Sequence, residues 1–170
     1  SPENALAFLA RQVKEFEFHD VLEMSGDVWQ MLSIWEASAT WLLKESPTEL
    51  PESEEMATIF NVLGNCSMVF KGKHIDALAL FKQAEVILKK IDQKEESPSV
   101  IINLMNQGFS LFLQGYYDPA EELFNRALDL AKRLASNKPA ALTAHCLNEL
   151  AMALDWKGDY IAAIEFCETA

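Results

Sequence analysis

Hydrophobic positions along this chain recur at the spacing of helices. Apolar side chains return every three or four residues, as on one face of an α-helix, and no stretch alternates as a β-strand would. Turn residues divide the pattern into helices over the ranges 3–24, 28–44, 54–70, 74–92, 99–113, 117–135, 139–156 and 160 to the end. The sequence therefore predicts an all-α fold of about eight antiparallel helices.

A glycine turn and the helix after it recur with a period of 43 residues. Gly72, Gly115 and Gly158 each stand between two helices, where a left-handed backbone needs no Cβ. The same three positions follow each glycine: Ala77, Phe81 and Ala84; Ala120, Phe124 and Ala127; Ala163, Cys167 and Ala170. A fixed period of this size is typical of stacked helical units.

Small residues on the first helix of each pair complete the pattern. Gly108 and Ala151 stand seven residues before their turn glycines, whereas Gly64 stands eight before Gly72, so that helix is one residue out of step. The pattern over residues 57–170 resembles the tetratricopeptide repeat, as in Leu150-Ala151-x-x-Leu154-x-x-x-Gly158-Asp159-Tyr160-x-x-Ala163. Its period exceeds the usual 34 residues and resembles the long-helix repeats of kinesin light chains and bacterial regulators.

The resemblance implies an α–α superhelix, a solenoid of stacked helix pairs. Residues 56–170 hold three pairs, the last incomplete. Residues 47–55 contain two prolines among acidic side chains, so we expect an acidic linker there, with Ser53 as N-cap of the next helix. Residues 1–46 are predicted to form a degenerate helical pair, either an N-terminal repeat-like unit or a cap.

Composition narrows the classes of partner. The net charge of the chain is −12, and residues 1–56 carry 12 acidic against 3 basic side chains. An acidic chain without a basic stripe is a poor nucleic-acid binder, and no apolar run reaches the roughly 20 residues of a membrane span. Cys66, Cys146 and Cys167 form no CxxC pair. Buried free thiols in a reducing, cytoplasmic setting are therefore expected.

The resemblance places binding on the concave side, which the first helix of each pair lines. The implied groove positions are Asn61, Asn65, Met105, Asn106, Phe109, Phe112, His145, Asn148, Glu149, Met152, Asp155 and Trp156. Asparagines both donate and accept, so a row of them can hold the backbone of an extended peptide, or can simply be solvated. None of these positions is Lys or Arg, which argues against a clamp for acidic peptide tails.

The sequence pattern does not bring together the set of residues that a catalytic or metal site requires. His145, Cys146 and Glu149 lie within about one helical turn, but a metal site needs three or four placed ligands. No organised nucleophile or glycine-rich phosphate loop is present in the sequence. We therefore expect no enzymatic activity, metal or cofactor.

Two apolar features leave alternatives open. Trp29, Trp35 and Trp41 either fill space between helices or at the end of the stack, or form an aromatic binding patch. Ile164 and Phe166 would lack a covering helix, so the chain is expected to be a fragment of a longer protein, or to dock there on a second copy. The favoured function is a non-catalytic scaffold that binds a peptide or partner helix in its groove. The alternative is an oligomerisation or sensor module of a larger regulator.

Overall fold

The computed structural model describes residues 2–14, 26–45, 52–92, 97–134 and 141–159. In these ranges the helices are α1 (Pro2–Lys14), α2 (Gly26–Glu45), α3 (Glu54–Lys71), α4 (His74–Ile91), α5 (Pro98–Leu113), α6 (Tyr117–Leu134) and α7 (Ala141–Lys157). No strand occurs among the described residues. The prediction of an all-α fold is confirmed. The eighth predicted helix, which carries Ala163, Ile164, Phe166, Cys167 and Ala170, lies outside these ranges.

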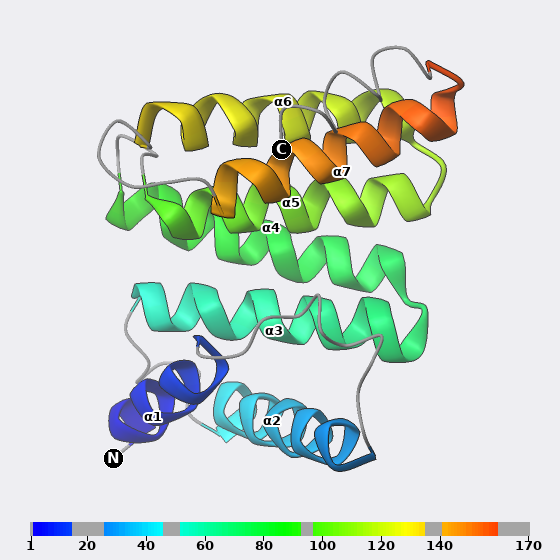
Figure 1. The fold of residues 1–170 in the computed structure, drawn as a ribbon. Helices are drawn as coiled ribbons and strands as arrows, with labels where there is room; N and C mark the ends of the chain where they lie inside the picture. Colours follow the sequence, from blue (N-terminus) through cyan, green and yellow to red (C-terminus); the bar gives the residue numbers. More distant parts are fainter. Residues whose placement is uncertain (1, 15–25, 46–51, 93–96, 135–140, 160–170) are drawn as a thin grey trace. The chain divides into compact units, whose positions relative to one another are not determined.

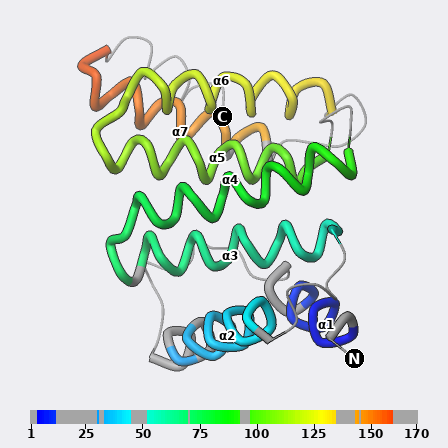
Figure 2. Tube along the Cα trace, turned by 180° about the vertical axis from the view of Figure 1, so that it is seen from behind, coloured from blue at the N-terminus to red at the C-terminus, as the bar shows by residue number. Residues whose placement is uncertain are grey.

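The chain divides into two compact units, residues 1–91 and 92–170. In the first unit, α1 and α2 contact each other and α3, and α3 forms a hairpin with α4 (Figure 1). In the second unit, α5 forms a hairpin with α6, and α7 contacts both of these helices (Figure 2). The division into residues 1–46, 47–55 and 56–170 stays a prediction.

Local residues fix where the paired helices begin and turn. The Ser53 hydroxyl accepts a hydrogen bond from the Met56 N–H at 3.4 Å, so Ser53 caps α3 as predicted. The turn glycines Gly72, Gly115 and Gly158 have φ angles of 60°, 83° and 85°. This left-handed conformation strains other residues, which explains the repeated glycine.

Each hairpin packs around a phenylalanine ring from its second helix. Phe81 in α4 and Phe124 in α6 are fully buried. A Cβ added at Gly108 would lie 2.6 Å from Cε1 of Phe124, and one added at Gly64 would overlap the Phe81 ring. The paired helices therefore approach closely because these two positions lack a side chain, in agreement with the small residues expected there.

Candidate functional site

The residues predicted to line the groove lie on the first helix of each pair. Asn61 and Asn65 belong to α3 in the first unit, where both are buried. The other ten belong to α5 and α7, which contact each other within the second unit. The candidate site is built on these two helices, and we call it the α5–α7 face. His145 lies in α7, but its side chain is outside what the structure describes.

The α5–α7 face contains buried, partly buried and exposed side chains. Met105 and Phe112 are buried, Asn106, Phe109, Glu149 and Met152 are partly buried, and Asn148, Asp155 and Trp156 are exposed. A surface with this gradation has both a floor that packs the two helices together and a rim that solvent reaches. Such a floor and rim are also found in protein interfaces.

Two sulfur atoms mark the floor of the face. Cys146 Sγ in α7 lies 3.4 Å from Met105 Sδ in α5, as a weak thiol–thioether hydrogen bond. Burial, assisted by the nearby Glu149 carboxylate, raises the pKa of Cys146 to about 12. The thiol therefore stays protonated at neutral pH and is a poor nucleophile. Cys66, in the first unit, is likewise a buried free cysteine, as predicted.

Two polar side chains on the face have buried atoms without a hydrogen-bond partner. They are Nδ2 of Asn106 in α5 and Oε2 of Glu149 in α7. Burial raises the pKa of Glu149 to about 7, and α5 carries no charged residue that would lower it. A buried polar atom that lacks a partner costs free energy, on the order of 1–3 kcal/mol. The face thus holds one unused donor and one unused acceptor.

The neighbouring buried amides on α5 are satisfied. Gln107 Nε2 donates to Asn103 Oδ1 at 2.8 Å, and both side chains are buried. Neither residue was among the predicted site residues, although their i, i+4 spacing in a helix is a signal for such a pair. Because these neighbours are paired, the unpaired amide of Asn106 is a local exception on α5 and not a general property of the helix.

Four aromatic rings gather at the end of the face where α5 and α7 finish. The Phe112 centroid lies 6.2 Å from that of Phe109, 5.5 Å from that of Tyr117 and 6.0 Å from that of Trp156, which it meets edge to face. Phe112 is buried, whereas Trp156 is 65% exposed. Phe109, Phe112 and Trp156 were among the predicted groove positions, whereas Tyr117 was not.

Metal chemistry finds no support in the part of the chain that is described. There, no three His, Cys, Asp or Glu side chains gather as a metal ion requires. Among the same residues, no helix has the length and hydrophobicity to cross a membrane. What the described part of the α5–α7 face does offer is unused hydrogen-bonding atoms and exposed aromatic surface.

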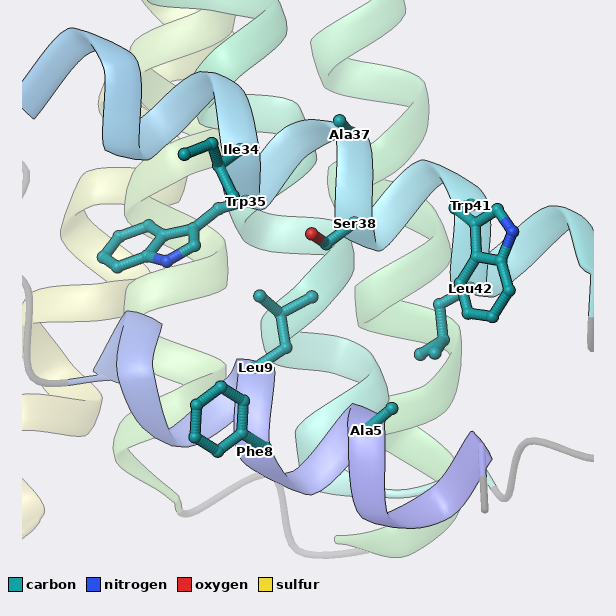
Figure 3. A pocket seen from close by; sticks show the side chains of 9 residues that line it. All are labelled: Ala5, Phe8, Leu9, Ile34, Trp35, Ala37, Ser38, Trp41 and Leu42. Carbon is teal, nitrogen blue, oxygen red and sulfur yellow. The ribbon is translucent and has the colours of Figure 1, made fainter.

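A second feature is an apolar pocket of about 590 Å³ in the first unit, between α1 and α2 (Figure 3). Trp35 and Trp41 lie toward opposite ends of it, and Ser38 supplies the only hydroxyl of its lining. The complete lining is Ala5, Phe8, Leu9, Ile34, Trp35, Ala37, Ser38, Trp41 and Leu42. Two of the three tryptophans that suggested an aromatic patch therefore border one pocket, while the side chain of Trp29 is outside the described set.

Comparison with known proteins identifies the repeat type. The tetratricopeptide repeat family matches residues 143–170, which include most of α7. Residues 143–170 are similar to a tetratricopeptide repeat. No match is found among curated proteins. The predicted resemblance to this repeat is thereby confirmed.

Solved structures of similar fold support the same assignment. BtubC (BKLC) from P. vanneervenii matches with a TM-score of 0.74 at 23% identity, over 84% of this chain and 56% of that one. A protein of Podosopora anserina described as a kinesin light chain with nearly identical TPR-like repeats matches with a TM-score of 0.55 at 13% identity, over 99% and 93%. The tetratricopeptide-type solenoid is thus confirmed as the fold class. The chain spans little more than half the length of BtubC.

Proposed function

We propose that the α5–α7 face binds a peptide, or a helix of a partner protein, and that the chain serves as a non-catalytic protein-interaction module. Repeats of the tetratricopeptide type generally mediate protein–protein interactions, and this supports the class of function. The observation that carries the proposal is the unused hydrogen-bonding capacity at Asn106 and Glu149 beside an aromatic cluster. A peptide backbone presents alternating donors and acceptors that can satisfy both atoms.

The aromatic cluster supplies the side-chain anchor that such a ligand needs. Trp156 is 65% exposed, and its ring meets that of the buried Phe112 nearly at a right angle. The indole is therefore supported by Phe112 while most of its surface stays accessible. Large exposed aromatic rings of this kind contribute much of the free energy at protein interfaces. The aromatic end would therefore hold an apolar ligand side chain, while the polar atoms fix the ligand backbone.

The test is a selection from a random peptide display library on the purified chain, followed by affinity measurements with the selected peptides. Trp156→Ala should weaken binding at least about tenfold, which corresponds to a contact of 1–2 kcal/mol. Trp41→Ala is the matched control, because Trp41 is 60% exposed but lies in α2 of the first unit. Equal effects of the two variants would contradict binding at the α5–α7 face.

Light scattering across a concentration series separates this function from oligomerisation. A mass near that of one 19.1 kDa chain at all concentrations agrees with a ligand-binding module. If the wild-type chain forms a dimer and the Trp156→Ala variant is a monomer, the same face binds a second copy of the chain. Self-association would then replace the peptide proposal.

A further inference from the structure

The unused atoms of Asn106 and Glu149 occupy the same place in successive repeats. Each stands two residues before the small residue of its helix, Gly108 in α5 and Ala151 in α7. Helices α5 and α7 contact each other, and Cys146 on α7 touches Met105 on α5, which directly precedes Asn106. Asn106 and Glu149 therefore lie close to this contact, with one unused donor on α5 and one unused acceptor on α7.

We propose that Glu149 determines the specificity of this face by selecting ligands that place a lysine or arginine side chain between α5 and α7, while Asn106 Nδ2 donates to a carbonyl oxygen of the same ligand. The proposal rests on the function proposed above and names the chemistry of the ligand. A cationic donor is the strongest available partner for a buried carboxylate oxygen, because charge-assisted hydrogen bonds gain strength where water is excluded.

The described residues around Glu149 include no basic side chain that pairs with its carboxylate, so we assign this pairing to the ligand. Helix α5 contributes no charged side chain, and Cys146 is a neutral thiol. On α6, Asp118 and Glu121 form ion pairs with Lys157 of α7, about two helical turns beyond Glu149. On α7 itself Asp155 is exposed, and the side chain of His145, one turn earlier, is outside the described residues. Burial alone accounts for the raised pKa of Glu149, and no basic side chain of the described residues acts to lower this pKa.

Binding of a cation to Glu149 is coupled to loss of its proton. Burial sets the pKa of the free carboxyl near 7, and an ammonium or guanidinium group favours the ionised form and lowers this pKa. Below pH 7 the ligand must displace a proton, so its affinity should fall by about tenfold for each pH unit. A neutral ligand side chain at the same point displaces no proton and should show no such dependence.

The experiment uses the random peptide display library, selected in parallel against the wild-type chain and the Glu149→Gln variant. Wild type should enrich Lys or Arg at one position of the selected peptides, and Glu149→Gln should not. Replacing that residue by Gln in a synthetic peptide should weaken binding to wild type by about 10- to 100-fold, but by much less to Glu149→Gln. Glu122→Gln, which removes a charge exposed on α6, should keep the wild-type preference and so exclude general charge steering.

Each remaining outcome decides one part of the proposal. Peptides that bind wild type without any basic preference would overturn the role of Glu149 and leave the groove function standing. Failure of every peptide to bind would overturn the groove function itself, and this inference with it. The pH dependence is measured in the His145→Gln background as well, and its disappearance there would assign the proton to His145 and contradict the proposal for Glu149.

Discussion

In the α3–α4 hairpin Gly64 lies against the ring of Phe81, and in the α5–α6 hairpin Gly108 lies against the ring of Phe124. The two rings are equivalent in the 43-residue period, but the two glycines are not, because Gly64 stands one residue too early. The contact between glycine and ring is nevertheless the same in both hairpins. The one additional residue between Gly64 and Gly72 must be accommodated at another point of the first hairpin.

The additional residue is accommodated in the turn between α3 and α4. After α3 the closing hydrogen bond runs from the Lys73 N–H to the Ser67 carbonyl, six residues back. After α5 the equivalent bond runs from Tyr116 to Leu111, which spans five residues. Helix ends tolerate such changes, because several hydrogen-bond patterns can satisfy the last carbonyl groups. Repeats of one family can thus differ in length at the turn without losing their core.

The hairpins also differ two residues before the small residue, where α3 has Val62, α5 has Asn106 and α7 has Glu149. Val62 is buried and apolar, whereas the other two hold the unpaired polar atoms. The second unit therefore carries a destabilising feature that the first unit lacks at this position. Such features persist where a ligand uses them, which is why the proposed function is placed on α5 and α7.

The largest expected effect is on the glycine contacts. Gly64→Ala should lower the free energy of unfolding by about 3 kcal/mol and Gly108→Ala by about 2 kcal/mol, because each methyl group meets a buried ring and the overlap is greater at Gly64. The gain in helix propensity, about 1 kcal/mol, offsets part of the cost. Urea unfolding of the two variants measures the difference.

A second substitution tests the cause of that destabilisation. In the Gly64→Ala background, Phe81→Leu should cost less than in wild type, since the smaller side chain relieves the overlap. The same cycle applies to Gly108 and Phe124. Additive effects in both hairpins, or a larger cost at Gly108 than at Gly64, would show that the two contacts are not the shared packing device inferred here.

The sequence was sufficient to predict helices α3 to α7 and the α3–α4 and α5–α6 hairpins. The period of 43 residues and the turn glycines placed α3 to α7 within two residues of their observed ends, because apolar spacing and glycine caps are local properties. The one-residue offset of Gly64 was also visible. Its structural consequence was not, since the length of a turn depends on which hydrogen bonds close it.

The candidate site was less accessible to sequence reasoning. The family resemblance selected Asn106 and Glu149 along with ten other residues, but it gave no reason to separate them from the exposed Asn148 or Asp155. Asn106 and Glu149 differ from the exposed residues because each has a buried polar atom without a hydrogen-bond partner. Both properties depend on how α5 and α7 pack. Tyr117 was missed for the same reason, because its contact with Phe112 joins the start of α6 to the end of α5.

The next largest effect is expected at Glu149, which occupies in α7 the position that the apolar Val62 occupies in α3. Glu149 has a pKa of about 7 in the folded chain against an ordinary value of 4.5, so the folded state binds the proton more tightly. Stability from this proton is complete below pH 4.5 and is lost as the pH rises through 7. Glu149→Gln does not titrate. Its free energy of unfolding should therefore match that of wild type at low pH. Above pH 8 it should be higher by about 2 kcal/mol, because solvent at the partly exposed side chain reduces the roughly 3 kcal/mol that the shift implies.

Unfolding free energies of wild type and Glu149→Gln across this pH range provide the measurement. Glu122→Gln, exposed on α6, controls for the loss of one negative charge from an acidic chain. A Glu149→Gln advantage that is constant with pH would mean that the carboxyl is not held in its neutral form by burial. The contrast between Val62 in the first unit and Glu149 in the second would then carry no energetic meaning.

The smallest effect distinguishes how the first helices begin. Ser53 caps α3 with a side-chain hydrogen bond to Met56, whereas Ser97 precedes α5 without one and is followed by Pro98, whose fixed φ already suits a helix start. Ser53→Ala should cost about 1 kcal/mol and Ser97→Ala no more than a few tenths, measured by urea unfolding. If Ser97→Ala proved as costly as Ser53→Ala, the proline would not replace the cap, and α5 would depend on its serine as α3 does.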